Sequence, residues 1–362
     1  MFYYLLYPLR DLVSFFNVFR YITFRSAMAA ITAFLISLIF GPLIIRKLKE
    51  FKVGEKINKG DSIKLDEMHR HKHNTPTMGG LLILLAVVGS TLMWADISNK
   101  NILIALFVTI WLGVTGFVDD YLKQSKKNAK GLTATTKLLS QLFLGIILGF
   151  LLLSDPNNRM SLDVPFLKDV TLYIDGFFIL FVILVIAGTS NAVNLTDGLD
   201  GLAIGIVVMV AIAFSVLSYV TGNVKLSEYL LVPFIKGTGE LTVFCASIIG
   251  AGLGFLWFNC YPAQIFMGDV GSLALGGALG TVALLIKKEL LLVIVGGIFV
   301  LEALSVILQV FSFRVFKKRI FKIAPIHHHF QFLNWPENKV IVRFWIIASL
   351  LALLTLVTLK IR

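Results

Sequence analysis

Ten apolar runs, each close to the length of a membrane-spanning helix, constrain the fold of this chain more than any other feature. They lie at 26–45, 78–95, 101–118, 138–154, 176–193, 201–220, 240–258, 271–286, 290–312 and 341–359. A helix needs about 20 apolar residues to cross the hydrocarbon core of a bilayer. The pattern therefore predicts an all-α, polytopic integral membrane protein with about ten transmembrane helices, in a single domain over residues 1–362. The run at 271–286 is short and rich in glycine.

The composition agrees with a membrane location. Hydrophobic residues make up 57% of the chain and charged residues 15%, with a mean hydropathy of +0.86. These values exclude an ordinary soluble domain and make the lipid bilayer an expected partner. The formal charge of +12 comes without a basic helix or an aromatic RNA-binding platform, so we predict no nucleic-acid partner. Cys245 and Cys260 lie in or beside apolar runs and form neither a disulfide framework nor a metal-binding pattern.

Lysine and arginine are distributed unevenly among the connections. Those at 46–76, 119–137 and 313–343 hold nine, five and seven of them, which is 21 of the chain's 33. Those at 96–100, 155–175, 221–239 and 287–289 hold only seven. Because basic connections stay on the cytoplasmic side, the first set is predicted to be cytoplasmic and both termini to lie outside. We expect the first span, rather than a removable signal peptide, to direct membrane insertion.

Three polar tracts begin or end spans on the predicted cytoplasmic face. Their sequences are GFVDDY (116–121), NAVNLTDGLDG (191–201) and FMGDVGS (266–272). The same face holds Lys72, Lys123 and Lys137 and two histidine clusters, one of His69, His71 and His73 and the other of His327, His328 and His329. Polar residues that converge at one face of a membrane protein usually line a site, so we expect an active-site cleft there.

Asp119 and Asp120 fall at the C-terminus of the third span, where the helix dipole disfavours carboxylates. They are either solvated side chains at the water boundary or part of a binding or base site. A cation, either Mg²⁺ or Lys123, would relieve their repulsion and favour the second interpretation.

The second tract spaces Asn191, Asn194, Asp197 and Asp200 by three residues. On an α-helix each such step falls about 60° short of a full turn, so a regular helix cannot direct all four side chains to one side. The two glycines of the tract predict a helix break and a polar loop that wraps a ligand, rather than a plain turn. All four residues are therefore candidate substrate-binding residues.

Asp269 lies between glycines at the start of the eighth span. It is either a simple N-cap or part of a site where small residues and backbone N–H groups let a phosphate approach closely. The two other acidic tracts on this face favour the site. Hard oxygen ligands in loops favour Mg²⁺ that is bound partly through substrate phosphates.

Together these motifs resemble one family. The Asp119-Asp120 pair, the NxxNxxDGxDG run, Asn259 with FMGD (266–269) and PIHHH (325–329) are similar to the phospho-N-acetylmuramoyl-pentapeptide transferases, of the polyprenyl-phosphate sugar-1-phosphate transferase superfamily. The resemblance extends from TPTMGG (75–80) to the last span. It implies ten spans, a cytoplasmic cleft and Mg²⁺-dependent transfer of phospho-N-acetylmuramoyl-pentapeptide from its UDP-activated form (UDP-MurNAc-pentapeptide) to undecaprenyl phosphate, giving lipid I and UMP. It also implies a homodimer in the bacterial inner membrane.

The resemblance assigns roles by position. Asp269 becomes the Mg²⁺ ligand, and Asp119 and Asp120 become the catalytic pair that acts on the lipid phosphate or assists the metal. Lys123 and Lys137 would neutralise phosphate charge. The positions that match the family's nucleotide pocket are Lys72, Asp197, Gly198, Leu199, Asp200, Asn259 and Phe266. Of these, Phe266 is expected to stack on the uracil ring.

The three histidines at 327–329 suit either a soft metal or a phosphate. They have no cysteine partners and share their face with five aspartates, so donation to the pyrophosphate or orientation of Asp269 fits better than zinc or copper. Neighbouring helical residues are about 100° apart, so the three cannot all face inward. We predict that His327 is catalytic and that His328 and His329 bind substrate. The cluster at 69–73 is interpreted as a solvated loop.

Several alternatives stay open. The three-histidine form resembles the muramoyl-pentapeptide branch, and the sister branch that uses UDP-N-acetylglucosamine is the first alternative. A cation transporter fits the same composition, although transporters place ionisable groups near the bilayer centre and often contain paired repeats. The GxxxG motifs at 145–149 and 276–280 are interpreted as helix packing rather than as a dimer code. We favour direct attack by the lipid phosphate over a covalent phosphoryl intermediate, which the sequence does not distinguish.

Overall fold

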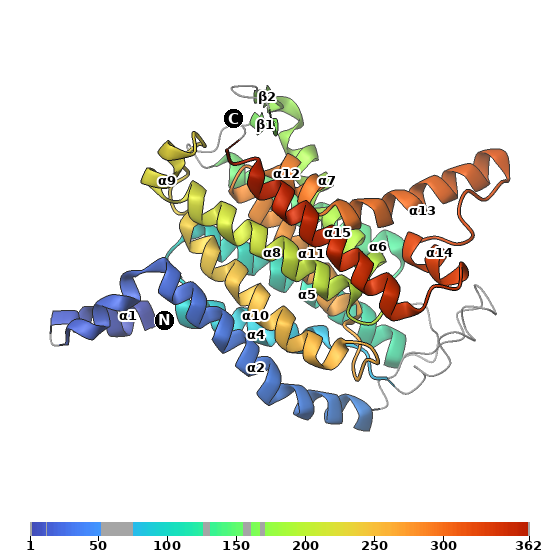
Figure 1. The fold of residues 1–362 in the computed structure, drawn as a ribbon, viewed down its shortest axis with the longest axis horizontal. Coiled ribbons are helices and arrows are strands. Elements are labelled where there is room, and N and C mark those ends of the chain that lie inside the picture. Colours follow the sequence, from blue (N-terminus) through green and yellow to red (C-terminus); the bar gives the residue numbers. More distant parts are fainter. Residues whose placement is uncertain are drawn as a thin grey trace.

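The computed structural model describes residues 2–11, 13–51, 75–125, 131–154, 161–166 and 171–360. Most of them belong to a bundle of long helices (Figure 1), which confirms the all-α class. The long helices are α2 (Ile22–Glu50), α4 (Gly80–Trp94), α5 (Lys100–Ser125), α6 (Ala134–Leu153), α7 (Phe178–Thr196), α8 (Leu202–Thr221), α10 (Leu241–Asn259), α11 (Gly268–Leu285), α13 (Gly297–Phe316) and α15 (Glu337–Val357). The short helices are α1 (Phe2–Leu6), η1 (Tyr7–Asp11), η2 (Ser14–Arg20), η4 (Asp175–Phe177), α9 (Val224–Tyr229), η5 (Thr238–Glu240), α12 (Glu289–Val295) and α14 (Ile326–Phe332). An antiparallel hairpin pairs β1 (Ser161–Asp163) with β2 (Thr171–Tyr173).

Nine helices within the described residues are long and apolar enough to cross a membrane, against the ten spans expected. The remaining run forms α4, which has only 15 residues. The chain before α4 pairs with another loop instead of extending the helix, because the N–H groups of Gly79 and Gly80 donate to the carbonyls of Phe266 and Met267 at 2.8 Å each. The second predicted span is therefore a short apolar helix that begins against the start of α11.

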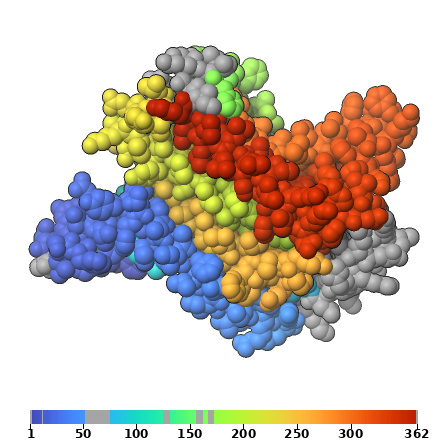
Figure 2. All heavy atoms as spheres, viewed as in Figure 1, coloured from blue at the N-terminus to red at the C-terminus, as the bar shows by residue number. Residues whose placement is uncertain are grey.

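The ninth apolar run, predicted as a span at 290–312, forms two helices, of which only the second, Gly297–Phe316, is long enough to cross a membrane. α12 ends at Val295 and α13 begins at Gly297, with Gly296 between them. Adjacent glycines weaken a helix because their backbone loses more freedom on folding and adds no side-chain packing. After this break α13 diverges from the bundle (Figure 1), and together with α14 it stands out as an arm in Figure 2.

The glycine-rich run at 271–286 forms the buried centre of the bundle. In α11, 89% of the residues are buried, the largest share among the nine candidate spans of the described residues. An ideal Cβ on Gly276 would lie 2.5 Å from the carbonyl oxygen of Thr189 in α7, and one on Gly80 would lie 2.1 Å from the backbone nitrogen of Gly271. The glycines at 145 and 149 meet side chains of α7 in the same way. Both GxxxG motifs therefore pack helices within the chain, as predicted.

The two ends of the bundle differ in what they carry. α2 begins and α15 ends at the same end, near the marks N and C in Figure 1. The opposite end holds the last turns of α2, the first turn of α15 and α14. The three polar tracts meet at this second end, where the candidate site lies.

Candidate active site

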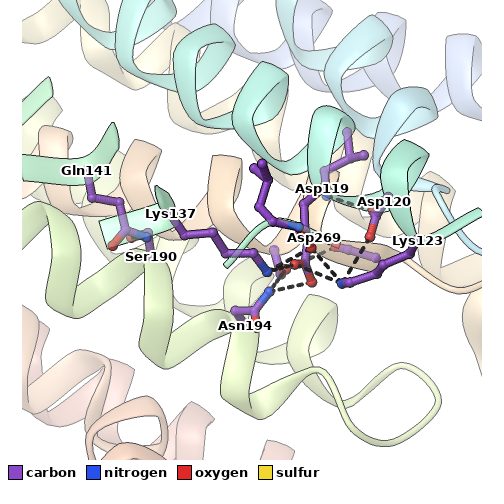
Figure 3. A network of polar contacts seen from close by, with 12 residues as sticks. Asp119, Asp120, Lys123, Lys137, Gln141, Ser190, Asn194 and Asp269 are labelled. Carbon is purple, nitrogen blue, oxygen red and sulfur yellow. Dashed lines mark hydrogen bonds and ion pairs between the residues drawn. The ribbon is translucent and has the colours of Figure 1, made fainter. Parts of the chain in front are cut away.

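Three carboxylates from two helices meet where α5 ends and α11 begins. Asp119, Asp120 and Asp269 each offer an oxygen atom within 4.8 Å of the others. Asp119 and Asp120 are 0% and 4% exposed, whereas Asp269 is half-buried. Figure 3 shows the three side chains pointing toward one another. The structure thus brings the first and third polar tracts into one cluster.

A glycine on α5 allows this meeting. An ideal Cβ on Gly116 would lie 2.2 Å from the backbone carbonyl oxygen of Asp269, so the first turn of α11 rests directly on α5. Asp119 and Asp120 follow Gly116 by three and four residues, which places them on the same side of α5. Asp269 belongs to the first turn of α11, where the helix dipole favours a carboxylate.

Two lysines hold the carboxylates together (Figure 3). Lys123 Nζ lies 2.6 Å from Asp119 Oδ2, 3.6 Å from Asp120 Oδ1 and 3.1 Å from Asp269 Oδ2. Lys137 Nζ, from α6, lies 2.7 Å from Asp119 Oδ2 and also contacts Asp269 Oδ2. With all groups ionised, three negative charges face two positive charges. The cluster therefore keeps a negative charge that a further cation would neutralise.

Backbone N–H groups fix the orientation of the buried pair. The N–H of Leu132 donates to Asp119 Oδ1 at 2.6 Å, and the N–H of Val270 donates to Asp120 Oδ2 at 3.2 Å. At Gly131, which has a φ of +51°, an ideal Cβ would lie 2.6 Å from Asp119 Oδ1. Only glycine therefore lets the chain before α6 approach the carboxylate this closely.

The second polar tract divides between a helix and a loop. α7 ends before Gly201, which has a φ of +77°, so the helix break predicted from the glycines is confirmed. Asn194, on the last turns of α7, donates to Asp269 Oδ1 at 2.9 Å. Asn191 donates instead to Gln141 Oε1 at 2.8 Å. Only one of these two asparagines thus contacts the carboxylate cluster.

Asp200 and Asn259 join the two loops beside the carboxylates. Both are buried, at 3% and 2% exposure. Asp200 Oδ2 accepts the N–H of Ala263 at 2.9 Å. Asn259 Oδ1 accepts the N–H of Gly201 at 3.0 Å, and its Nδ2 donates to the carbonyl of Ile265 at 2.7 Å. These two side chains therefore tie the α7–α8 loop to the α10–α11 loop.

The other predicted pocket residues lie in the same two loops. Asp197 and Phe266 are half-buried, and Gly198 follows Asp197 directly. Leu199 packs into the hydrophobic core, at 4% exposure. Its backbone is therefore the part that a ligand in the loop could contact. Lys72 and the histidines at 69–73 lie outside the described residues, so their roles stay predictions.

The three consecutive histidines have different environments. His327 is fully buried, whereas His328 and His329 are half-buried, which confirms that the three do not all face the same way. His328 Nδ1 lies 2.8 Å from Gln331 Oε1. His329 Nδ1 accepts the N–H of Lys322 at 3.1 Å. The innermost ring is therefore that of His327, the residue predicted to be catalytic.

Sequence reasoning missed one residue of this region, Glu302 on α13. Its Oε2 lies 3.1 Å from His327 Nδ1, and both side chains are fully buried. Glu302 falls inside the ninth apolar run, which we interpreted only as a span. A lone carboxylate within an apolar run is itself a signal of function in a membrane helix, and that signal was available.

The carboxylate cluster suits a hard divalent cation. Within the described residues, this is the group of metal-ligating side chains that could hold an ion, and it contains neither histidine nor cysteine. Carboxylate oxygens are the ligands that Mg²⁺ prefers, whereas zinc and copper prefer nitrogen and sulfur. Asp119, Asp120 and Asp269 are therefore the residues that could hold Mg²⁺.

Two family models match the chain. One, described as glycosyl transferase family 4, matches residues 102–287, and phospho-N-acetylmuramoyl-pentapeptide-transferase signature 1 matches residues 72–84. Proteins named phospho-N-acetylmuramoyl-pentapeptide-transferase from Desulfotalea psychrophila, Desulforapulum autotrophicum and Desulfatibacillum aliphaticivorans are 52%, 51% and 54% identical to it. Each match covers 100% of this chain and 100% of the relative. The similarity therefore includes every segment that forms the candidate site.

Proposed function

Since this chain belongs to the phospho-N-acetylmuramoyl-pentapeptide-transferase family, we propose that it transfers phospho-N-acetylmuramoyl-pentapeptide from UDP-MurNAc-pentapeptide to undecaprenyl phosphate. The products are lipid I and UMP, in the first membrane step of peptidoglycan synthesis. One observation carries the proposal beyond the family name. It is the cluster of Asp119, Asp120 and Asp269 with Lys123 and Lys137 at one end of a membrane bundle.

The reaction brings one phosphate anion against another. An oxygen of the lipid phosphate attacks the phosphorus that carries the sugar, and the bond from that phosphorus to the bridging oxygen breaks as UMP leaves. Lys123 and Lys137 supply positive charge for the phosphate oxygens from two different helices. Much of the remaining rate comes from holding the two phosphates in line.

Mg²⁺ is the cofactor of the proposal, with Asp269 as its principal ligand. Bound there, the ion supplies charge neutralisation at the pyrophosphate. Asp269 fits this role because it is the most exposed of the three carboxylates and because Asn194 orients it. Asp119 and Asp120 assist the metal or accept the proton of the lipid phosphate.

The nucleotide end of the donor is proposed to bind along the loops that Asp200 and Asn259 join. Phe266, half-buried in the α10–α11 loop, offers an aromatic ring for the uracil. His328 and His329 are expected to contact the substrate from α14 because their rings remain partly accessible.

The end of the bundle that holds the site is proposed to face the cytoplasm. The predicted inner connections hold 21 of the 33 basic residues, and cytoplasmic connections of membrane proteins are enriched in such residues. Both termini then lie outside the inner membrane. The homodimer implied by the family resemblance also stays a prediction.

The test is a reaction of the purified protein with Mg²⁺, undecaprenyl phosphate and UDP-MurNAc-pentapeptide, with UDP-N-acetylglucosamine in a parallel reaction. UMP release with the muramoyl donor alone is expected. Release with only the other donor would assign the chain to the sister branch. Ion flux through vesicles without UMP release would favour a transporter. An Asp269→Asn variant with an unchanged melting curve serves as the inactive control.

A further inference from the structure

A buried acid and a buried imidazole face each other next to the α7–α8 loop, outside the carboxylate cluster. Glu302, in the second turn of α13, and His327, in α14, are each 0% exposed. His327 Nδ1 lies 3.1 Å from Glu302 Oε2. Within the described residues, neither oxygen of Glu302 and neither ring nitrogen makes a regular hydrogen bond. Burying such groups is costly unless they offset each other, so each side chain depends on the other.

The opposite edge of the imidazole rests on a glycine. An ideal Cβ on Gly198 would lie 2.3 Å from His327 Nε2, so the ring occupies the space that a side chain at position 198 would need. Nε2 is therefore directed at the backbone of the α7–α8 loop. This loop also carries Asp197 and Asp200, and through Asp200 it is tied to the α10–α11 loop.

The pair also links the arm to the bundle. α13 diverges from the other helices after Gly296, and α14 returns beside the beginning of α15 (Figure 1). Glu302 belongs to the first part of this arm and His327 to the second. Because His327 contacts Gly198, a shift of Glu302 would be transmitted through one ring to the loop at 197–201.

We propose that Glu302 is a positioning residue for the transfer reaction. Its carboxylate faces Nδ1 of His327 at 3.1 Å and thereby fixes the ring so that Nε2 supports the backbone at Gly198. The loop at 197–201 is then held in the shape that receives the nucleotide donor. The inference rests on the proposed function, which makes the UDP-linked sugar the substrate. Carboxylates fix histidine tautomers and orientation in the same way at metal sites and in catalytic triads.

Steady-state kinetics of Glu302 variants test this role. Glu302→Leu removes the carboxylate, and we expect the KM for UDP-MurNAc-pentapeptide to rise about 10- to 100-fold, the size of effect expected for losing one polar contact with a charged group. The KM for undecaprenyl phosphate should change by less than about twofold, since the cluster at Asp269 is untouched. Glu302→Gln keeps the shape and one acceptor oxygen and should restore most of the donor affinity.

Glu289→Gln is the matched control. Glu289 is also a buried glutamate, at 3% exposure, but it lies in α12, which contacts the β-hairpin at the other end of the bundle. The kinetic constants of Glu289→Gln should equal those of the wild type. The positioning role would be overturned if Glu302→Leu raised the KM values for both substrates equally. It would also be overturned if Glu289→Gln raised the KM for UDP-MurNAc-pentapeptide as much as Glu302→Leu does.

A double-mutant cycle shows whether Glu302 acts through His327. In a His327→Ala background, Glu302→Leu should add less than about twofold to the donor KM, because the group that it positions is gone. If the two substitutions raised the donor KM by independent factors, so that the double variant showed their product, the proposal would be overturned. Melting curves are recorded for each variant, and the cycle is run with Glu302→Ala, which also removes the carboxylate, if the leucine variant does not fold. A wild type that releases no UMP would overturn the proposed function instead, so the two failures are distinguishable.

Discussion

The side-chain amide of Asn194 donates to Asp269 Oδ1 at 2.9 Å, joining α7 to α11 across 75 residues of sequence. The same amide also donates to Ser272 Oγ at 2.9 Å. Both hydrogens of the amide are therefore used within α11. The arrangement leaves Asp269 Oδ2 to the two lysines and to any cation that replaces them.

Asn194→Ala should reduce activity and Mg²⁺ affinity without removing a charge from the site. Asp269 loses a fixed donor, so we expect kcat to fall about tenfold and the Mg²⁺ concentration for half-maximal rate to rise. The measurement is a Mg²⁺ titration of the purified variant. Asn191→Ala is the matched control, because Asn191 lies one turn earlier on α7 and donates to Gln141. Equal effects of the two substitutions would contradict a specific role for Asn194.

Removing the charge of Asp269 and removing that of Asp119 should reduce activity in different ways. Asp269→Asn loses the proposed Mg²⁺ ligand and should show little turnover except at high Mg²⁺. Asp119→Asn should keep a near-normal Mg²⁺ dependence with kcat lowered by about 10²–10⁴, the usual cost of losing a general base. Higher pH should recover part of that loss if the missing step is deprotonation. Wild-type Mg²⁺ dependence of Asp269→Asn would transfer the ligand role to Asp119 or Asp120.

The contact between α5 and α11 should tolerate no side chain at position 116. Gly116→Ala places a methyl group 2.2 Å from the carbonyl oxygen of Asp269, and overpacking of this kind costs about 1–3 kcal/mol or more. We expect both a lower melting temperature and lost activity, because the carboxylates separate. Gly188→Ala is the control, since a Cβ there meets nothing within 4 Å. Unchanged activity in Gly116→Ala would show that the helix contact is not required by the site.

Cysteine labelling tests the orientation of the bundle. Lys317→Cys, after α13, should react with an impermeant thiol reagent only in permeabilised cells, whereas Lys225→Cys, in α9, should react in intact cells. Both side chains are exposed. The exposed Cys260 must first be replaced by serine, while Cys245 is buried and can stay. Labelling of position 317 from outside would reverse the proposed topology.

A buried carboxyl outside the spanning helices should make stability depend on pH. Burial raises the pKa of Glu289 to about 7 from its ordinary 4.5. Between these values the folded protein holds a proton that the unfolded chain has lost, so stability falls as pH rises from 4.5 through about 7.

Glu289→Gln stays neutral throughout this range. It should melt near the wild-type temperature at acidic pH and at a higher temperature at about pH 8.5, above the folded pKa. The measurement is a series of melting curves in detergent for both proteins. A difference in melting temperature that did not change with pH would disprove the assignment to this carboxyl.

The amino-acid sequence was enough to predict the membrane class, the approximate positions of the helices and the grouping of polar tracts at the ends of spans. These features depend on local properties, because hydropathy over about 20 residues and glycines that break helices act within a short stretch of chain. The break of α7 before Gly201 is one such case. Another is the start of α11 at Gly268, which places Asp269 in the first turn of that helix.

Which polar residues contact one another depends on how the helices pack. Asn191 and Asn194 are equivalent in the sequence pattern, yet only Asn194 reaches Asp269, because α7 packs on α11 with that turn facing the cluster. Glu302 pairs with His327 only because α13 diverges and α14 returns. Such contacts depend on helix crossings that glycines permit at a few points, and the partner of each glycine lies far away in the sequence. A local pattern carries no information about that partner, so the geometry of the site required the folded chain.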